Sequence, residues 1–338
     1  MSFQRIGSVS AIALALGGAI TLLVTSGTVL SLLTQAIVYA VFAIGVGILL
    51  RQNGMVSFGH ALFFGATGYV IGILLQLQIM SAEAAIVFTL LAVVVVAFLM
   101  GLVMVRVPGV AFGMLTLAVG QMAYLTVSRS RGLTGGADGM NIDWPSTLFG
   151  MPLSMLLTPA HIFLLSWVTL VVILALLGVL LNSRFGSITE AVRDNEERAR
   201  FIGIRTVIPR AAIYALSAVV TGVAGLLSAL NTGFVSPENL HWSLSGVALM
   251  MVVVGGYKAL WGTSVGCCGV FLGQRHLGRL RQPLDGDFWC GTHHRDCVFA
   301  DWHCRRIDTL DHGTKSPNLP RVGWALRGIQ NERLCIAS

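Results

Sequence analysis

Hydrophobic residues in this chain come in long unbroken blocks rather than in the stripes that mark a helix or strand with one buried face. Most blocks reach the ~20 residues that an α-helix needs to cross a hydrocarbon layer of ~30 Å. They are residues 8–28, 29–50, 57–79, 84–105, 110–128, 160–182, 211–232 and 243–257. Because lipid offers no hydrogen-bond partner to a bare backbone, such segments must be helical. The pattern predicts an all-α bundle of about eight transmembrane helices.

The composition excludes an ordinary soluble domain. The chain is 55% hydrophobic and 11% charged, with a mean hydropathy of +0.79, whereas soluble domains are roughly one quarter charged. Arg5 before the first block would also suit a cleaved secretory signal. The apolar core is longer than the ~7–15 residues of such signals, and further blocks follow, so an uncleaved first span is the favoured interpretation.

The distribution of Lys and Arg predicts the orientation, because cytoplasmic loops carry an excess of both. If the N-terminus is cytoplasmic and the spans alternate, ten basic residues up to position 266 lie inside and only Arg129 and Arg131 lie outside. The ten are Arg5, Arg51, Arg106, Arg184, Arg193, Arg198, Arg200, Arg205, Arg210 and Lys258. This bias accounts for the net charge of +7, which therefore does not point to nucleic-acid binding.

Residues 183–206 place nine charges between two apolar blocks. Ser187 and Glu190 fit a capping box at a helix start, and Gly203 fits a left-handed residue just past a helix end. We therefore expect one short cytoplasmic helix over about 188–202. Asp194–Arg198 and Glu196–Arg200 would be its (i, i+4) ion pairs, and its apolar stripe would be Ile188, Ala191, Val192, Ala199 and Ile202. Such a helix is either a solvated connector or a docking helix with an apolar ridge seated in a partner's groove.

The stretch "EAVRDNEERARFIG" resembles the cytoplasmic loop of binding-protein-dependent ABC importer permeases, in its Glu190-Ala191 and in the distance to Gly203. The resemblance favours docking, since it implies a coupling helix that sits on the ATP-hydrolysing subunit. It implies contacts at Glu190, Ala191, Arg193, Asp194, Glu197 and Gly203.

Three further stretches look like the branched-chain amino acid type of these permeases. They are "NGMVSFGHALFFGATGY" (53–69), "PGVAFGMLTLAVGQMAYLTVSRSRGLTGGADGM" (108–140), and "SALNTGFVSPENL" followed by "VVVGGYKALWGTSVG" (252–266). Together the matching blocks cover about residues 30–266. The resemblance implies two ABC ATPase subunits, a second permease subunit and an extracytoplasmic solute-binding protein as partners, in a bacterial inner membrane.

Several residues in these blocks are candidates for the substrate pathway. Small residues let helices approach closely or leave room for a solute, and an ionisable group at membrane depth, here His60, is a functional candidate. The candidates are Ser57, Gly59, His60, Thr116, Gln121, Gly135 and Gly136. Ordinary helix packing and a neutral hydrogen-bonded histidine are the competing interpretations. The family often carries Glu where this chain has Gln121, which leaves its substrate preference open.

The sequence offers no basis for an enzyme. The phosphate-binding pattern G-x-x-x-x-G-K-[ST] is missing, so ATP hydrolysis is expected in partner chains and no cofactor or metal in this one. No nucleophile–base set or paired carboxylates occur within the spans. Asp138 and Asp143 lie in the loop expected outside, where they would shape a turn or meet a binding protein.

The last 72 residues, 267–338, differ in character from the rest. They hold all six cysteines, five of eight histidines and 17 of 37 charges. A zinc-binding domain, a genuine soluble tail and a shifted reading frame would each account for them. The cysteines lack C-x₂₋₄-C spacing, and the change falls inside a family-like stretch, so the frameshift is the favoured hypothesis. We thus divide the chain into a permease domain, 1–266, and a tail that is frameshifted or disordered.

The function predicted from the sequence is a membrane-spanning subunit of an ABC importer for branched-chain or related amino acids. Alternatives within the family are urea, amides or other small solutes, or a non-functional, frameshifted copy. A secondary transporter or channel would need intramembrane acids as an ion relay, and only Glu83 near a span end fits. A membrane-anchored metal sensor using the Cys/His tail is the third alternative.

Overall fold

The computed structural model describes residues 3–24, 26–78, 80–107, 109–148 and 150–256. The predicted tail, the proposed boundary at 266 and Lys258 lie outside these residues. The described part is helical nearly throughout, which confirms the all-α fold class.

Each of the eight apolar blocks forms a helix. The helices are α1 (Phe3–Leu23), α2 (Gly27–Asn53), α3 (His60–Gln76), α4 (Ala82–Met104), α5 (Val110–Arg129), α8 (Pro159–Leu181), α11 (Val207–Thr232) and α12 (Trp242–Gly255). Among the described residues, five of them (α2, α4, α5, α8 and α11) are long and apolar enough to cross a membrane, while α3 and α12 are shorter apolar helices. The outward sides of α4 and α5 are rich in exposed aliphatic residues, as expected of helices that face lipid.

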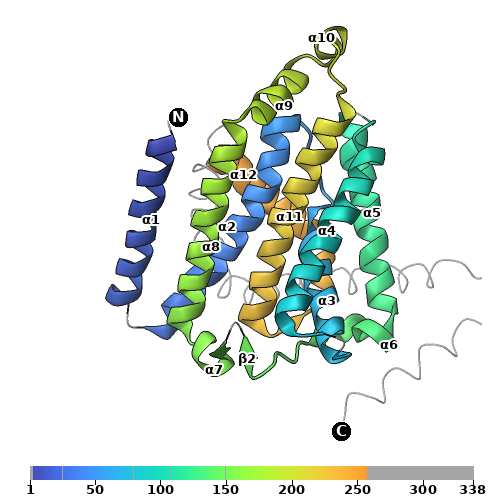
Figure 1. Ribbon diagram of the computed structural model, residues 1–338. Coiled ribbons are helices and arrows are strands. Elements are labelled where there is room, and N and C mark those ends of the chain that lie inside the picture. Colours follow the sequence, from blue (N-terminus) through green and yellow to red (C-terminus); the bar gives the residue numbers. More distant parts are fainter. Residues whose placement is uncertain (1–2, 25, 79, 108, 149, 257–338) are drawn as a thin grey trace, which may run out of the picture. The chain divides into compact units, whose positions relative to one another are not determined.

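Helix α11 packs against α2, α3 and α4 (Figure 1). Glycines allow this close approach: Gly45 of α2 and Gly101 of α4 both face α11. Gly225 of α11 itself lies on the backbone of Phe64 in α3, where even a methyl group would collide with the Phe64 carbonyl. Without a hydrophobic force between helices in lipid, such small-residue contacts are what hold a bundle together.

Helix α3 is short because the chain enters the bundle before it becomes helical. Residues 54–59, between α2 and α3, form no helix or strand and lie against α5. A side chain on Gly59 would collide with the carbonyl of Thr116, and Gly113 lies beside the Val56 carbonyl. Irregular backbone at membrane depth is tolerated only where protein or a cavity surrounds it, and here α5 supplies that cover.

The segments between α5 and α8 lie at the end of the bundle opposite to the charged loop (Figure 1). They are α6 (Arg131–Thr134), η1 (Gly136–Asp138), β1 (Met140–Asn141), β2 (Thr147–Leu148), β3 (Met151–Pro152) and α7 (Leu153–Leu156). β2 pairs antiparallel with β3, and β1 pairs with β4 (Phe234–Val235), which follows α11 and precedes η2 (Pro237–Leu240). Gly139, with φ +74°, allows the close approach of Val235.

Replacing Gly225 by alanine is expected to destabilise the bundle, because the added methyl group would collide with backbone rather than with a movable side chain. Overpacking of this kind costs about 1–3 kcal/mol. Gly246 in α12 is the matched control, since a methyl group there meets no described residue within 4 Å. Thermal unfolding of the two variants in lipid nanodiscs tests this, and equal melting temperatures would contradict it.

Candidate coupling surface and buried histidine network

The charged loop forms two helices rather than the single helix expected over 188–202. Helix α9 (Arg184–Asp194) begins four residues earlier than predicted, and α10 (Glu196–Phe201) follows it. Asn195 separates them with an extended backbone, φ −156° and ψ 100°, and its Oδ1 accepts the Arg198 N–H at 2.9 Å. The predicted capping box is wrong: Ser187 lies within α9 and donates to the Arg184 carbonyl. The capping residue is Asn195, which directly precedes Glu196 and Glu197 at the start of α10.

The end of α10 is as the sequence predicted. Gly203 has φ +86° and donates its N–H to the Arg200 carbonyl at 2.9 Å, and Ile204 donates to the Ala199 carbonyl at 3.0 Å. These two bonds define a Schellman motif, which satisfies carbonyls at a helix end and requires a left-handed residue.

The apolar stripe, predicted to lie on one helix face, is divided between a buried face and an exposed face. Val192 and Ala199 are buried against the bundle, but Ile188, Ala191 and Ile202 are exposed. The break at Asn195 rotates α10 relative to α9, so the spacing of a continuous helix does not hold across it. Phe201, which the sequence analysis missed, is 90% exposed. Exposed apolar side chains therefore lie beside charged ones on the outer surface of α9 and α10.

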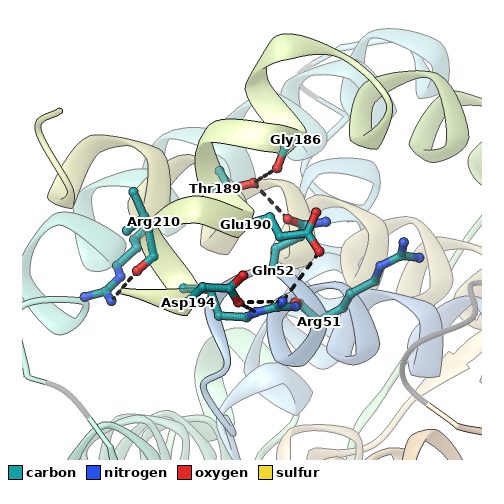
Figure 2. A network of polar contacts seen from close by, with 9 residues as sticks. Arg51, Gln52, Gly186, Thr189, Glu190, Asp194 and Arg210 are labelled. Carbon is teal, nitrogen blue, oxygen red and sulfur yellow. Dashed lines mark hydrogen bonds and ion pairs between the residues drawn. The ribbon is translucent and has the colours of Figure 1, made fainter. Parts of the chain in front are cut away.

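Helix α9 is fastened to the end of α2 (Figure 2). The Thr189 hydroxyl donates to Gln52 Oε1 at 2.8 Å, and Arg193 Nη1 donates to the Arg51 carbonyl at 2.5 Å. The second contact satisfies one of the carbonyls left free at a helix C-terminus, where a cation is also favoured by the helix dipole. Arg193 thus points largely inward, with its side chain 28% exposed.

Helix α10 is fastened instead to α11, through Glu196. Its carboxylate accepts from Arg210 of α11 at 2.6 Å, from Arg200 at 2.6 Å and from the Thr206 hydroxyl at 3.0 Å. The pair with Arg200 is the one expected from the spacing, and it is confirmed. Asp194 and Arg198 form no ion pair, because Asp194 binds Arg193 instead at 2.7 Å.

The ionisation of Glu196 is governed by opposing effects. Partial burial raises the pKa of this carboxyl, but hydrogen bonds from Arg210 and Thr206 and the charges of Arg210 and Arg200 outweigh it, so the pKa of Glu196 lies below its ordinary value. Sequence spacing could reveal the Arg200 contact. It could not reveal Arg210, which lies 14 residues away on another helix.

The residues proposed to meet an ATPase are mostly on the outer surface. Those that are exposed are Glu190, Ala191, Asp194, Glu197 and Gly203. Arg193 is the exception, because α2 holds it. Their role in coupling stays a prediction.

Inside the bundle, His60 joins three helices through hydroxyl groups. Its Nε2 lies 2.6 Å from Ser217 Oγ of α11, and its Nδ1 lies 2.9 Å from Ser57 Oγ. Ser217 donates its own proton to the Gly45 carbonyl of α2 at 2.5 Å, so it must accept from His60 Nε2–H. Ser57 then supplies its proton to Nδ1. A neutral imidazole with its proton on Nε2 satisfies every group in this chain.

Four of the seven pathway candidates meet here: Ser57, Gly59, His60 and Thr116. Thr116 accepts the Phe58 N–H at 3.3 Å, and Ser57, His60 and Thr116 are 1% exposed or less. Gln121 lies farther along α5 with its buried Oε1 lacking a partner among the described residues. Gly135 and Gly136 are not part of the group; both have positive φ and form the start of η1, at the end of the bundle opposite to the charged loop. The sequence analysis missed Ser217 and also Ser245 of α12, which accepts the Ala61 N–H at 2.8 Å.

A family model described as "Branched-chain amino acid transport system / permease component" matches residues 28–275. The chain belongs to this family. The match includes α2 to α12 and both helices of the charged loop. Together with its apolar helices, this makes the chain a multi-pass membrane protein of a permease family.

Individual relatives agree on the class of protein but differ in solute. The high-affinity branched-chain amino acid transport system permease protein LivM of Escherichia coli is 26% identical over 254 residues, which is 69% of this chain and 60% of LivM. LivM of Salmonella typhimurium matches to the same extent. The autoinducer 2 import system permease protein LsrC of Yersinia pseudotuberculosis is 29% identical over 205 residues, 60% of this chain and 54% of LsrC. The chain thus spans less than two thirds of either protein, and no solved structure matches it.

Replacing Ser217 by alanine is expected to cost about 1–3 kcal/mol of stability, because it leaves a buried donor on His60 unpaired. Ser166→Ala is the control. Ser166 is equally buried but donates only to the Ile162 carbonyl, one turn back in its own helix. Thermal unfolding distinguishes them, and equal losses in both variants would show that the histidine network does not stabilise the bundle.

Replacing Glu196 by glutamine should alter the pH dependence of stability. Because the pKa of Glu196 is lowered in the folded chain, its contribution is present above the ordinary carboxyl range and is lost as pH falls through the lowered value. Melting curves from neutral to acid pH should therefore show a smaller acid loss in E196Q than in the wild type. E197Q removes an exposed carboxylate of the same helix without breaking an ion pair among the described residues, and it should keep the wild-type profile. Identical pH profiles of stability for E196Q and E197Q would show that the contacts of Glu196 with Arg200 and Arg210 do not stabilise the folded chain.

Proposed function

We propose that this chain is the membrane-spanning subunit of an ABC importer for branched-chain or related small amino acids. By its family, it would work with two ATPase subunits, a second permease subunit and an extracytoplasmic binding protein. The observation that carries the proposal is the surface of α9 and α10. It presents exposed apolar and charged residues on one side and is fastened to α2 and α11 on the other.

Coupling requires that a force on the loop reach the spans. Arg193 ties α9 to the end of α2, and Glu196 ties α10 to α11 near its start. Phe201 and Ile202, 90% and 71% exposed, would be the apolar anchors in a groove of the ATPase, with Glu190 and Glu197 at the rim. The charged end would then be cytoplasmic, and the N-terminus with it, as the distribution of Lys and Arg predicts.

The relatives' names point to different solutes. Amino acids are supported by LivM, whereas LsrC is named for the import of autoinducer 2. The fully buried His60 network presents no free charge to a solute, because each polar atom in it has a partner. A binding protein would therefore select the solute, with branched-chain amino acids as the first to test and urea, amides or other small solutes next.

Charge reversal at Glu190 and Gly203→Pro are each expected to abolish ATP-driven uptake. The first inverts an exposed charge of the contact, and the second removes an N–H that bonds the Arg200 carbonyl and forces a residue out of φ +86°. The measurement is uptake by the assembled transporter in liposomes, with co-purification of the ATPase and solute capture by the isolated binding protein as companion readouts.

The matched control for Glu190→Arg is Glu238→Arg, which reverses an exposed acid in η2, following α11 and β4. It should leave ATPase co-purification intact, and solute capture should be unchanged in every variant. Normal uptake and normal ATPase association in both Glu190→Arg and Gly203→Pro would rule out the coupling role.

A further inference from the structure

The charged end of the bundle contains a cavity beside the Glu196–Arg210 ion pair. Its volume is about 320 Å³, and it lies between the end of α4, the start of α11 and α10. The residues lining it are Val105, Arg106, Glu196, Arg200, Val207 and Arg210. Three arginines and one glutamate therefore line the cavity, an excess of two positive charges among the described residues.

The one acid in the cavity is already fully engaged. Both oxygens of Glu196 accept hydrogen bonds, from Arg200, Thr206 and Arg210. Arg106 has no ion-pair partner within the described part of the chain, and Arg210 keeps an Nε–H without an acceptor there. The cavity thus holds more donors than its own side chains can satisfy.

The start of α11 adds to this positive character. Thr206 occupies the N-cap position, but its hydroxyl bonds Glu196 rather than an N–H of the helix, so Thr206 does not cap α11 with its side chain. The free N–H groups at the start of a long helix carry a partial positive charge that favours an anion. Val207, in the first turn, lines the cavity.

We propose that this cavity binds a phosphate group, held by Arg106 and Arg200 beside the start of α11. Guanidinium groups bind phosphate oxygens through paired hydrogen bonds, and basic pockets between transmembrane helices suit anionic headgroups. A phospholipid and free phosphate share this chemistry. The neighbouring residues favour the lipid: Val103, near the end of α4, and Ile208, which follows Val207 in α11, are 67% and 49% exposed, so exposed apolar side chains lie close in sequence to the charged site.

The site would connect the bilayer to the loop, an effect that rests on the proposed coupling function. A phosphate bridging Arg106 and Arg200 ties the end of α4 to α10, which otherwise is held through Glu196 and α11. The anionic lipid content of the membrane would then set how firmly α10 is held. Binding itself does not depend on transport and is measured separately from it.

The test uses the full chain in nanodiscs of phosphatidylcholine, to which phosphatidylglycerol is added in steps while the melting temperature is followed. A ligand that binds the folded state raises that temperature in a saturable way. R106Q is the first variant, since it breaks no ion pair among the described residues, and R106Q/R200Q is the second. R198Q/R205Q is the matched control, because it removes two exposed arginines of the same loop that do not line the cavity.

We expect the phosphatidylglycerol concentration at half-effect to rise roughly tenfold in R106Q and further in R106Q/R200Q, as for the loss of charge-assisted hydrogen bonds. The control should shift by less than about threefold, the loss of general surface attraction. Inorganic phosphate added to phosphatidylcholine discs identifies the source: saturable stabilisation by phosphate alone supports a soluble anion, and none supports the lipid. Equal shifts in control and cavity variants, or no response to either compound, would overturn the proposal.

Discussion

The architecture depends on the close packing of α11 against three neighbours. Glycines at the contacts with α2, α3 and α4 bring backbone against backbone, so that α11 cannot shift without moving all of them. The same helix bonds α10 through Arg210 near its start and His60 through Ser217 about two turns farther in. One helix therefore takes part in the packing of the bundle, in the anchoring of the charged loop and in the hydrogen bonding of His60.

Much of this could be predicted from the sequence. Uninterrupted apolar blocks gave all eight helices, because a bilayer leaves the backbone no alternative. Gly203 was recognised as a helix end because few residues other than glycine adopt φ +86° readily. The family resemblance covered the stretches that the family model then matched.

The errors have a common physical origin. The charged loop was treated as one helix because its apolar spacing continues past Asn195, whereas side-chain capping by Asn195 interrupts it. Arg193 was placed among the contact residues by the family resemblance, whereas its guanidinium bonds the Arg51 carbonyl at the end of α2. Ser217 and Arg210 carry no local signal, since their partners lie at least 14 residues away in the sequence. Tertiary contacts of this kind are set by packing, which spacing along one segment does not encode.

The interruption at Asn195 gives the loop two main attachments, which Arg210 links because its Nη2 also donates to the Val192 carbonyl of α9 at 3.5 Å. Arg193 attaches α9 to the end of α2, and Glu196 attaches α10 to the start of α11, with a single extended residue between them. A continuous helix would transmit a displacement to α2 and α11 together. Two short helices separated by an extended residue instead present one surface attached to the end of α2 and one attached to the start of α11. The crossing of α2 and α11, where Gly45 meets Ser217, is also where His60 is held.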